Sequence, residues 1–482
     1  MEPIFELALV LPRRGSRELL RALHSQLRKA IIDGRLKPGV RLPPTRQLAA
    51  AKGVSRNTAL AAYELLLSEG YLVARRGSGT FVATAIPARG KSRPPTTSSA
   101  NDRRLNPFWR HPPPPLRLQR QQLRYNFQLG AAEQALFPFD VWRSLSARAI
   151  RQMALSADRH GEVHGRAALR EAIAHYISLT RAVACGPDDI VVTTGAQQAF
   201  DLLARVLVSG PQMVVAVENP GYPPLRTPFE ASGAKLAPTP VDGDGLLVSS
   251  LSSRARVVCV TPSHQFPLGS PMSMARRVEL LQFAQARGAV IIEDDYDAEF
   301  RFGGQPLDAL QTLDRSESVF YVGTFSKSLF PAIRMGFIVT PPWARTALHA
   351  AKESADSRCP VQTQDTLAAF IADGHMARHV RRMRQIYDRR RELILESLNK
   401  HFSRWLQPVP SSAGLHLTAF AKMPLDANEL AKRARELDVG VHPLTPFYLG
   451  KPTRAGIALG YGAIEEPAII EGLARLRRVL AT

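Results

Sequence analysis

A lysine in a short polar turn is the residue of this chain best suited to covalent chemistry. Lys327 closes the tetrapeptide Thr324-Phe325-Ser326-Lys327, which follows an apolar run at residues 319–322. A lysine amine at the end of a buried strand can form a Schiff base with a carbonyl compound. Because a lone lysine is usually an ordinary surface residue, this interpretation depends on what other segments contribute.

Carboxylates follow a second apolar run, residues 290–293. The acidic stretch 293–297 reads Glu-Asp-Asp-Tyr-Asp and emerges where the predicted strand ends. Ligands of α/β sheets bind at that edge, so one of these carboxylates could hold a protonated ring nitrogen. The same residues could instead be solvated loop charges or a cation site, although the glycine of an EF-hand loop is missing.

Residues suited to an anion and to an aromatic ring lie after two further runs. Thr194-Gly195-Ala196-Gln197 opens a helix after residues 190–193, and the free N–H groups of a helix start suit a phosphate. Gly195 could also simply permit a tight turn. Tyr222, in Asn219-Pro220-Gly221-Tyr222, could lie over a ring, and Arg334 could complete the phosphate site.

These segments supply the four parts that a pyridoxal 5′-phosphate site needs. The parts are an amine for the aldehyde, an acid for the ring nitrogen, a platform for the ring and a cradle for the phosphate. Each part alone has an ordinary explanation, but all four occur at strand ends in one chain. The sequence therefore predicts pyridoxal phosphate as the cofactor, with Lys327 as the catalytic lysine.

A different chemistry is indicated near the N-terminus, where Ser55, Arg56, Asn57 and Thr58 open a predicted helix. The N-terminal end of a recognition helix enters the major groove of DNA. Arginine can bind guanine and asparagine can bind adenine through two hydrogen bonds each. The hydroxyl groups are better suited to phosphate oxygens, or they could merely cap the helix.

Three more arginines extend this predicted DNA-binding surface. Arg46 lies in the preceding helix, where it would contact phosphates, and Arg75 and Arg76 lead into a glycine-rich turn that could reach backbone or minor groove. The elements that must position them are three helices and a hairpin. The apolar spacing predicts helices over 17–34, 46–52 with Thr45 as N-cap, and 55–69, followed by strands around 71–82. This order is typical of a winged helix-turn-helix.

The rest of the chain predicts a linker and an α/β domain. Residues 84–124 are rich in proline and arginine and predict an extended linker. From residue 125 to 482, β-branched runs alternate with helical segments, which predicts a mostly parallel sheet covered by helices. The segment 375–482 begins with an arginine-rich helix and predicts a smaller cap. The DNA-binding domain would then occupy residues 1–83.

Two families are resembled by these motifs. Arg-Leu-Pro-Pro-Thr-Arg (41–46), Gly-Val-Ser-Arg-Asn-Thr (53–58) and Gly-Ser-Gly-Thr-Phe-Val (77–82) closely resemble the GntR-type winged-helix repressors. Five segments resemble fold-type I, class I aminotransferases: Gly-Ala-Gln-Gln (195–198), Asn-Pro-Gly-Tyr (219–222), Thr-Pro-Ser-His-Gln-Phe-Pro-Leu-Gly (261–269), Glu-Asp-Asp-Tyr-Asp-Ala-Glu-Phe-Arg (293–301) and the stretch 323–336 around Lys327. The combination resembles the MocR-type transcriptional regulators, which fuse the two.

The resemblance implies roles for the site residues. Lys327 would bind the cofactor covalently, Asp294 would bond the pyridine nitrogen, Tyr296 the phenolic oxygen, and Tyr222 would stack on the ring. The residues that would surround the phosphate are Gly195, Ala196, Gln197, Ser326 and Arg334. It also implies a head-to-tail homodimer whose two winged helices read two half-sites of an operator.

One departure from the family pattern concerns the substrate carboxylate. Amino-acid-binding relatives carry an arginine in an Arg-Leu-Gly-like stretch near the C-terminus, but here that position is Ala458, and Arg454 lies out of register. Alanine cannot bind a carboxylate. We therefore expect a regulator with little or no transaminase turnover, whose effector is a small amine, an amino acid or pyridoxal phosphate itself. The alternative is an active aminotransferase with an accessory DNA-binding head.

Composition agrees with a nucleic-acid partner. The chain of 482 residues carries a net charge of +21, with 14 Lys/Arg against 6 Asp/Glu in residues 1–83 and 9 against 1 in residues 84–124. Basic charge concentrated there suits DNA phosphates. The three cysteines show no metal-ligand spacing, so no metal site is predicted. No signal peptide or membrane-span pattern is seen, so we expect a cytoplasmic protein without a membrane partner. Control of vitamin B6 or amino-compound metabolism is a further hypothesis.

Overall fold

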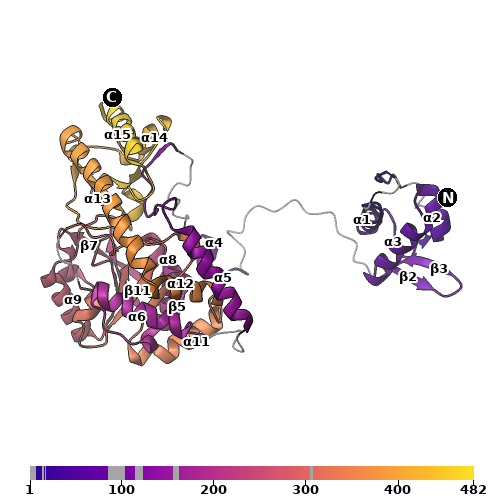
Figure 1. Ribbon diagram of the computed structural model, residues 1–482, viewed down its shortest axis with the longest axis horizontal. Coiled ribbons are helices and arrows are strands. Elements are labelled where there is room, and N and C mark those ends of the chain that lie inside the picture. Colours follow the sequence, from indigo (N-terminus) through magenta and orange to yellow (C-terminus); the bar gives the residue numbers. More distant parts are fainter. Residues whose placement is uncertain are drawn as a thin grey trace. The chain divides into compact units, whose positions relative to one another are not determined.

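The computed structural model describes residues 7–13, 16, 18–84, 104–113, 123–155, 162–303 and 308–481. The chain divides into two compact units, Met1–Arg104 and Leu105–Thr482, drawn in Figure 1. Most of the predicted linker, 84–124, lies outside the described residues, so its extended form stays a prediction. Within it, a four-residue helix α4 (Pro107–Arg110) begins where the Asn106 side chain accepts a hydrogen bond from the Phe108 amide, 3.0 Å away.

The N-terminal unit is a three-helix core with a three-stranded sheet. Its elements are α1 (Leu19–Ile32), β1 (Arg41–Leu42), α2 (Thr45–Lys52), α3 (Arg56–Ser68), β2 (Leu72–Arg75) and β3 (Gly79–Val82). Strand β3 lies between β1 and β2 and is antiparallel to both. Apolar side chains of all three helices form its core, which includes the fully buried Leu27, Leu48 and Leu66. The three helices and the hairpin lie where the apolar spacing placed them; the short strand β1 was not predicted.

The start of α2 differs by one residue from the sequence prediction. Thr45 was expected to cap the helix from outside, but Thr45 is its first residue and Pro44 occupies the cap position without a side-chain hydrogen bond. The proline ring fixes φ near the value seen here, −51°, and the Pro44 carbonyl accepts from the Gln47 amide at 2.9 Å. Backbone geometry therefore begins this helix in place of a hydroxyl cap.

The C-terminal unit is built on an eight-stranded sheet. In spatial order its strands are β5 (Ile190–Thr193), β12 (Gly336–Val339), β11 (Val319–Thr324), β10 (Val290–Asp295), β9 (Ala255–Val260), β6 (Val214–Asn219), β7 (Lys235–Asp242) and β8 (Gly245–Leu246). Strands β11, β10, β9, β6 and β7 are parallel, while β12 is antiparallel to both neighbours. The carboxyl ends of the parallel strands therefore meet at one edge.

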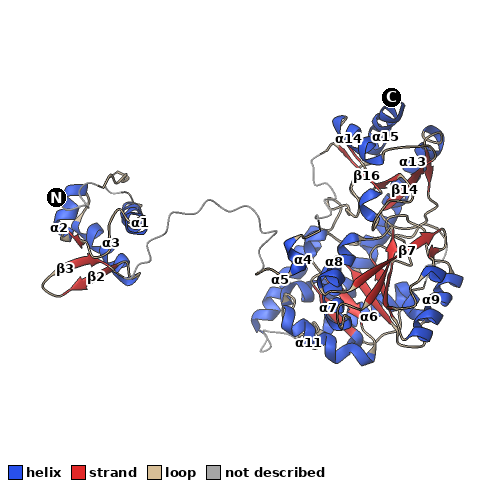
Figure 2. Cartoon of the chain, turned by 180° about the vertical axis from the view of Figure 1, so that it is seen from behind, coloured by secondary structure: helices blue, strands red, loops and turns tan. Residues whose placement is uncertain are grey.

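Helices cover both faces of this sheet (Figure 2). One face packs against α7 (Ala196–Leu207), α8 (Pro223–Ala231) and α11 (Arg345–Ala355). The other packs against α5 (Phe139–Leu155), α6 (Ala167–Arg181), α9 (Met274–Arg287), α10 (Leu310–Leu313) and α12 (Val361–Ala372). The strands are continuous apolar runs because both of their faces are buried.

A smaller second layer follows from residue 375. It comprises α13 (His375–His401), β13 (Leu406–Pro408), β14 (His416–Ala421), α14 (Ala427–Glu436), β15 (Val439–Gly440), β16 (His442–Pro443), β17 (Gly456–Gly460) and α15 (Glu466–Ala481). Four of its strands form a sheet in the order β13-β14-β17-β16. An earlier segment joins it, because β4 (Tyr125–Asn126) pairs in parallel with β15.

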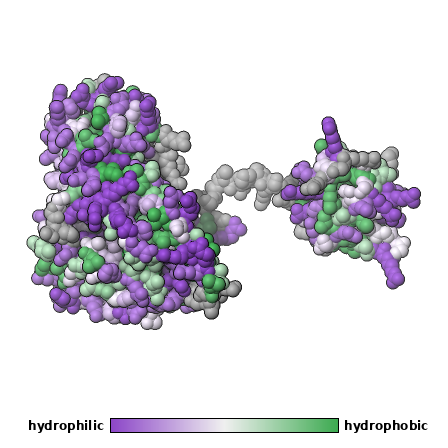
Figure 3. Space-filling model, in the orientation of Figure 1, coloured by the Kyte–Doolittle hydropathy of each residue, from purple (hydrophilic) through white to green (hydrophobic). Residues whose placement is uncertain are grey.

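The surface of the C-terminal unit is largely hydrophilic on the side shown in Figure 3, with small hydrophobic areas between the polar side chains. Some large apolar side chains are nevertheless exposed, including Leu179 of α6 and Trp343. None of the helices among the described residues combines the length and the apolar character needed to cross a membrane.

Candidate cofactor site and nucleic-acid interface

Lys327 lies in the turn that follows β11, at the carboxyl edge of the large sheet. Its Nζ donates a hydrogen bond to the Gly130 carbonyl oxygen, 2.7 Å away. Burial lowers the pKa of Lys327, although Asp297 and Asp294 act in the opposite direction. A lysine with a lowered pKa is more readily a neutral amine, which is the form that attacks a carbonyl carbon.

The acidic residues at the end of β10 are separated by the alternation of side chains along the strand. Glu293 and Asp295 point away from the Lys327 cavity: Glu293 accepts hydrogen bonds from the Leu310 and Gln311 amides, at 2.8 and 2.9 Å. Asp295 forms a buried ion pair with Arg181 at 2.7 Å. The side chain between them, Asp294, lines the cavity that holds Lys327.

Asp294 is a buried carboxyl group with one unsatisfied oxygen among the residues that the structure describes. The side chain is buried, and Oδ1 has no hydrogen-bond partner in the part of the chain that the structure describes. Burial, with the neighbouring Asp295, raises the pKa of Asp294 well above its usual value, whereas Lys327 lowers it. A buried carboxylate in this state is stabilised by any ligand that brings a positively charged N–H group to it.

The opposite end of the cavity is formed by the start of α7. Gly195 precedes the helix with a φ of +98°, a conformation that favours glycine, and a side chain there would lie 3.5 Å from the guanidinium carbon of Arg334. The first residues of α7 are Ala196 and Gln197, whose amides have no partner within the helix. Helix start and guanidinium together suit a phosphate.

Aromatic side chains form a third wall. The rings of Tyr222 and Phe266 lie 5.2 Å apart in an edge-to-face arrangement, and both line the cavity. Burial raises the pKa of Tyr222 to about 12, so the phenol is neutral at pH 7. These two rings give the cavity an aromatic lining.

The structure brings the sequence-predicted cofactor residues together. Those lining a single cavity are Ala196, Gln197, Tyr222, Asp294, Tyr296, Ser326, Lys327 and Arg334. Gly195 lies against Arg334 at the same end. These residues lie at or after the ends of β5, β6, β10 and β11, or in the case of Arg334 just before β12, so only the folded sheet makes them neighbours.

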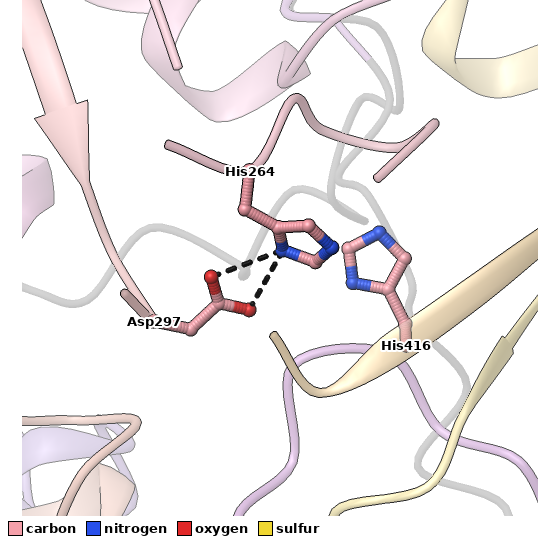
Figure 4. A group of neighbouring side chains, drawn as sticks. All are labelled: His264, Asp297 and His416. Atoms are coloured by element: carbon pink, nitrogen blue, oxygen red, sulfur yellow. Dashed lines mark hydrogen bonds and ion pairs between the residues drawn. The ribbon is translucent and has the colours of Figure 1, made fainter. Parts of the chain in front are cut away.

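Sequence analysis missed a group of three buried side chains beside Tyr296, namely His264, Asp297 and His416 (Figure 4). His264 Nδ1 donates to Asp297 Oδ1 at 3.0 Å, and the Tyr296 hydroxyl donates to the His264 carbonyl at 2.9 Å. His264 and Asp297 stood in segments that carried the resemblance, and Asp297 was one of the candidate carboxylates, but nothing in the pattern placed the two beside each other. His416 comes from the small layer, more than a hundred residues away.

The residue types of this group would permit a metal ion, but each side chain is engaged in hydrogen bonds within the protein. Asp297 Oδ2 accepts from the Leu415 amide at 3.1 Å, and His416 Nε2 donates to the Pro267 carbonyl at 2.9 Å. We interpret the group as a hydrogen-bonded network that fixes Tyr296. The expectation that the chain has no metal site stays a prediction.

In the N-terminal unit, the start of α3 has the geometry of a capped helix. Ser55 has extended backbone geometry, and its Oγ accepts a hydrogen bond from the Thr58 amide at 3.0 Å. The Ser55 and Thr58 hydroxyls also lie 2.8 Å apart. Tyr63 of α3 donates to the Pro43 carbonyl at 3.0 Å, which links the helix to the turn before α2. Ser55 therefore caps the helix, and a DNA contact would be an additional role.

The basic side chains of this unit are accessible. Arg46, Arg56 and Arg76 are exposed, and within the described residues none of them has an ion-pair or hydrogen-bond partner. Arg75 is also exposed and lies over the Phe81 ring, 5.0 Å from its centroid. Asn57 is exposed beside Arg56. Cationic groups without an internal partner are available to DNA phosphates and bases.

The C-terminal cavity fits pyridoxal phosphate. Its unpartnered Asp294 Oδ1 suits a protonated ring nitrogen, its helix start suits a phosphate, and Lys327 suits the aldehyde. When bound, the cofactor supplies an electrophilic aldehyde carbon that amines can bind covalently.

Comparisons with known proteins agree with a DNA-binding N-terminal unit and an aminotransferase-like C-terminal unit. Residues 125–463 match the family described as aminotransferase class I and II, and residues 19–82 match the bacterial regulatory proteins of the gntR family. The C-terminal unit resembles a kynurenine aminotransferase from Pyrococcus horikoshii, with a TM-score of 0.70 and 26% identity over 76% of this chain and 92% of that one. It also resembles the α-aminoadipate aminotransferase LysN from Thermus thermophilus, with a TM-score of 0.68 and 28% identity over 74% and 92%.

A winged helix and an aminotransferase-type cofactor site in one chain define a transcription regulator built on an enzyme fold. Relatives match over nearly the whole length. The "probable rhizopine catabolism regulatory protein MocR" of Rhizobium meliloti is 38% identical, over 97% of this chain and 95% of its own. The regulator TauR of Rhodobacter capsulatus is 36% identical, over 97% of both chains. The chain belongs to the MocR-type transcriptional regulators, and the predicted fold class, cofactor and regulatory function are confirmed.

Proposed function

We propose that the cofactor is held by the residues that surround the C-terminal cavity. Lys327 binds the aldehyde carbon, Asp294 the ring nitrogen, Tyr296 the phenolic oxygen, and Tyr222 packs on the ring. The residues that bind the phosphate are Gly195, Ala196, Gln197, Ser326 and Arg334. The observation that carries this assignment is the unpartnered Asp294 Oδ1 in the same cavity as the Lys327 amine.

The winged helix binds a double-stranded operator through the start of α3 and the wing. Arg56 and Asn57 face base edges in the major groove, as the first residues of a recognition helix do. Ser55, Thr58 and Arg46 contact phosphates, and the wing arginines are Arg75 and Arg76. The support is that these arginines are exposed and that Arg46, Arg56 and Arg76 have no partner within the described residues.

The protein acts as a cytoplasmic homodimer in which residues 84–124 link a DNA-binding domain, 1–83, to the cofactor domain, 125–482, with a cap at about 375–482. Two winged helices then read two half-sites. Pyridoxal phosphate, alone or with a small amine or amino acid bound to it, favours one spacing of those helices, which requires unequal affinity for the two states.

Control of vitamin B6 or amino-compound metabolism is the regulated function that this site supports best. A relative from Corynebacterium glutamicum, 30% identical over 93% of this chain, is named a pyridoxine biosynthesis transcriptional regulator. Ala458 disfavours the alternative of an efficient aminotransferase, because the carboxylate of an amino acid has no arginine at that position.

Two substitutions separate the two halves of this proposal. Lys327→Ala is expected to abolish the visible absorbance band of the bound cofactor, because that band requires the covalent bond to Nζ. Arg56→Ala is expected to abolish operator binding, measured by protection of the gene's own upstream DNA, while the visible band stays intact. An unchanged band in the first variant would refute the cofactor assignment, and undiminished protection in the second would refute the recognition-helix assignment.

A further inference from the structure

The cofactor cavity offers few positive charges to a second ligand. Within the described residues, the lysines and arginines that line it are Lys327 and Arg334. Both are taken up by the cofactor in the proposed function, Lys327 by the aldehyde and Arg334 by the phosphate. A ligand that enters beside the cofactor therefore meets a lining that is neutral or negative.

The position where related aminotransferase-like proteins carry an arginine is apolar here. Ala458 lies on β17 between Thr418 of β14 and His442 of β16, and it is fully buried. Its neighbours in an apolar cluster include Phe266. Thr418 is already engaged, because its hydroxyl donates to the Pro267 carbonyl at 2.5 Å. The Thr418 hydroxyl is therefore not free to donate to a carboxylate beside Ala458.

The histidines near Ala458 do not replace the positive charge of the arginine that related proteins carry at this position. His416 lines the cavity, and its Nε2 donates to the Pro267 carbonyl, so a neutral ring leaves Nδ1 as an acceptor. Burial and the neighbouring His264 hold the pKa of His416 well below its usual value. Burial also lowers the pKa of His442 to about 4. Both rings are therefore uncharged at pH 7.

Two other arginines lie close to this region, but neither faces the cofactor. The Arg454 guanidinium lies 3.6 Å from the centroid of the Phe420 ring and lines a second, separate cavity. Arg226 is buried and donates to the Phe447 and Glu218 carbonyls, at 2.7 and 3.2 Å. A carboxylate in the cofactor cavity would lose its hydration without gaining a cation, which is unfavourable.

We infer that the effector of this protein is a small primary amine that carries no carboxylate and whose other polar groups are uncharged. This inference rests on the proposed function, in which Lys327 binds the cofactor. The amine nitrogen of the effector forms the double bond to the aldehyde carbon, and the bond from that carbon to Lys327 Nζ breaks. The two hydrogens of the amine pass to Nζ, so the exchange needs no oxidant or reductant.

The test uses the full chain loaded with pyridoxal phosphate and two matched pairs of probes. The pairs are 2-aminoethanol with glycine and 3-aminopropan-1-ol with β-alanine, which present similar amines with and without a carboxylate. Each probe is titrated against the visible absorbance band and against operator affinity. The amino alcohols are expected to act at concentrations at least about tenfold lower than the matched amino acids.

Equal or stronger effects of glycine and β-alanine would overturn the inference, and so would a band that responds to none of the four probes. Arg454→Gln is the matched control and is expected to leave all four titrations unchanged. If this variant lost a response to an amino acid, the second cavity would be the carboxylate site and the inference would be wrong. Ala458→Arg is expected to strengthen the amino-acid responses, once circular dichroism shows that the variant folds.

The readouts also separate this inference from the proposed function. The visible band could distinguish the amino alcohols from the amino acids while operator affinity responds to none of the four probes. The inferred class of ligand would then be correct, but the proposal that this ligand controls DNA binding would be wrong. If Lys327→Ala retains the visible band, the cofactor assignment fails, and the probe responses report on another amine site.

Discussion

Burial favours the uncharged forms of both Lys327 and Asp294, although the two side chains have opposite charges. Neither therefore has the solvation that would stabilise it as an ion in this cavity. A protonated ring nitrogen next to Asp294 removes that cost by giving the carboxylate a charged hydrogen bond. The binding free energy of the cofactor and the ionisation of Asp294 are thus linked.

The first prediction concerns this link. Asp294→Asn keeps the size of the side chain but removes its charge, so cofactor affinity is expected to fall at least about tenfold. Titration of the visible band with pyridoxal phosphate measures the effect. Asp201→Asn, at a partly exposed position of α7 that pairs with Arg205, is the control and should bind like the native chain. Unchanged affinity in Asp294→Asn would contradict the assigned role.

The second prediction concerns Glu218, a fully buried carboxyl that accepts from the Thr261 hydroxyl at 2.6 Å. Burial raises the pKa of Glu218 to about 7 from 4.5. Below pH 4.5 the Glu218 carboxyl group is protonated in the folded and the unfolded chain alike, so its ionisation does not lower the free energy of unfolding there. Between pH 4.5 and 7 the unfolded chain ionises first, and the free energy of unfolding falls by roughly 3 kcal/mol.

Glu218→Gln cannot ionise and should escape this loss. The thermal midpoint of the C-terminal unit in the variant is therefore expected to rise relative to the native chain between pH 5 and pH 8. Thermal melts of both proteins at the two pH values measure this. A difference in midpoint that stays constant with pH would show that Glu218 titrates normally.

At the scale of single elements, Ser55 has two roles at the start of α3: it caps the helix, and in the proposed function it contacts a DNA phosphate. The third prediction is that Ser55→Ala lowers the free energy of unfolding of the N-terminal unit by about 1 kcal/mol, because the Thr58 amide loses its acceptor. Denaturant unfolding followed by far-UV circular dichroism measures it. Ser78→Ala, at the exposed wing tip, is the control and should have little effect. Equal stabilities would mean that the cap contributes nothing.

The elements also show which parts of the site could be predicted from sequence. Asp294 and Lys327 were recognisable because Asp294 lies at the end of one buried strand and Lys327 follows another, and the sheet geometry then places strand ends at one edge. His416 could not be recognised from the sequence, because it belongs to no motif and reaches the cavity from β14 of the small layer. Strand β7 was also missed, because Pro238 and Pro240 interrupt its pattern; it lies beside the two-residue strand β8, near the edge of the sheet.

At the scale of the whole chain, the N-terminal part that would bind DNA carries an excess of basic residues. Residues 1–83 carry 14 Lys/Arg against 6 Asp/Glu, while the chain as a whole has a net charge of +21. The fourth prediction is that operator affinity falls steeply with salt. Arg46→Ala should reduce the slope of log K against log [salt] by about 0.9, the value for one phosphate contact.

Fluorescence anisotropy on an operator fragment at several salt concentrations measures that slope. Arg315→Ala removes an equal charge from an exposed position in the C-terminal unit and should leave the slope unchanged. If both variants changed the slope equally, net charge alone would drive the binding.

The segment 125–130 is bonded both to the small layer and to Lys327. Its first residues are bonded into the small layer, where β4 pairs with β15 and the Phe127 amide donates to the Gly440 carbonyl at 2.9 Å. Its last residue, Gly130, accepts the hydrogen bond from Lys327 Nζ. When Nζ bonds to the cofactor, the Gly130 carbonyl loses this hydrogen bond, while residues 125–129, which lead back to the predicted linker, keep their hydrogen bonds to the small layer.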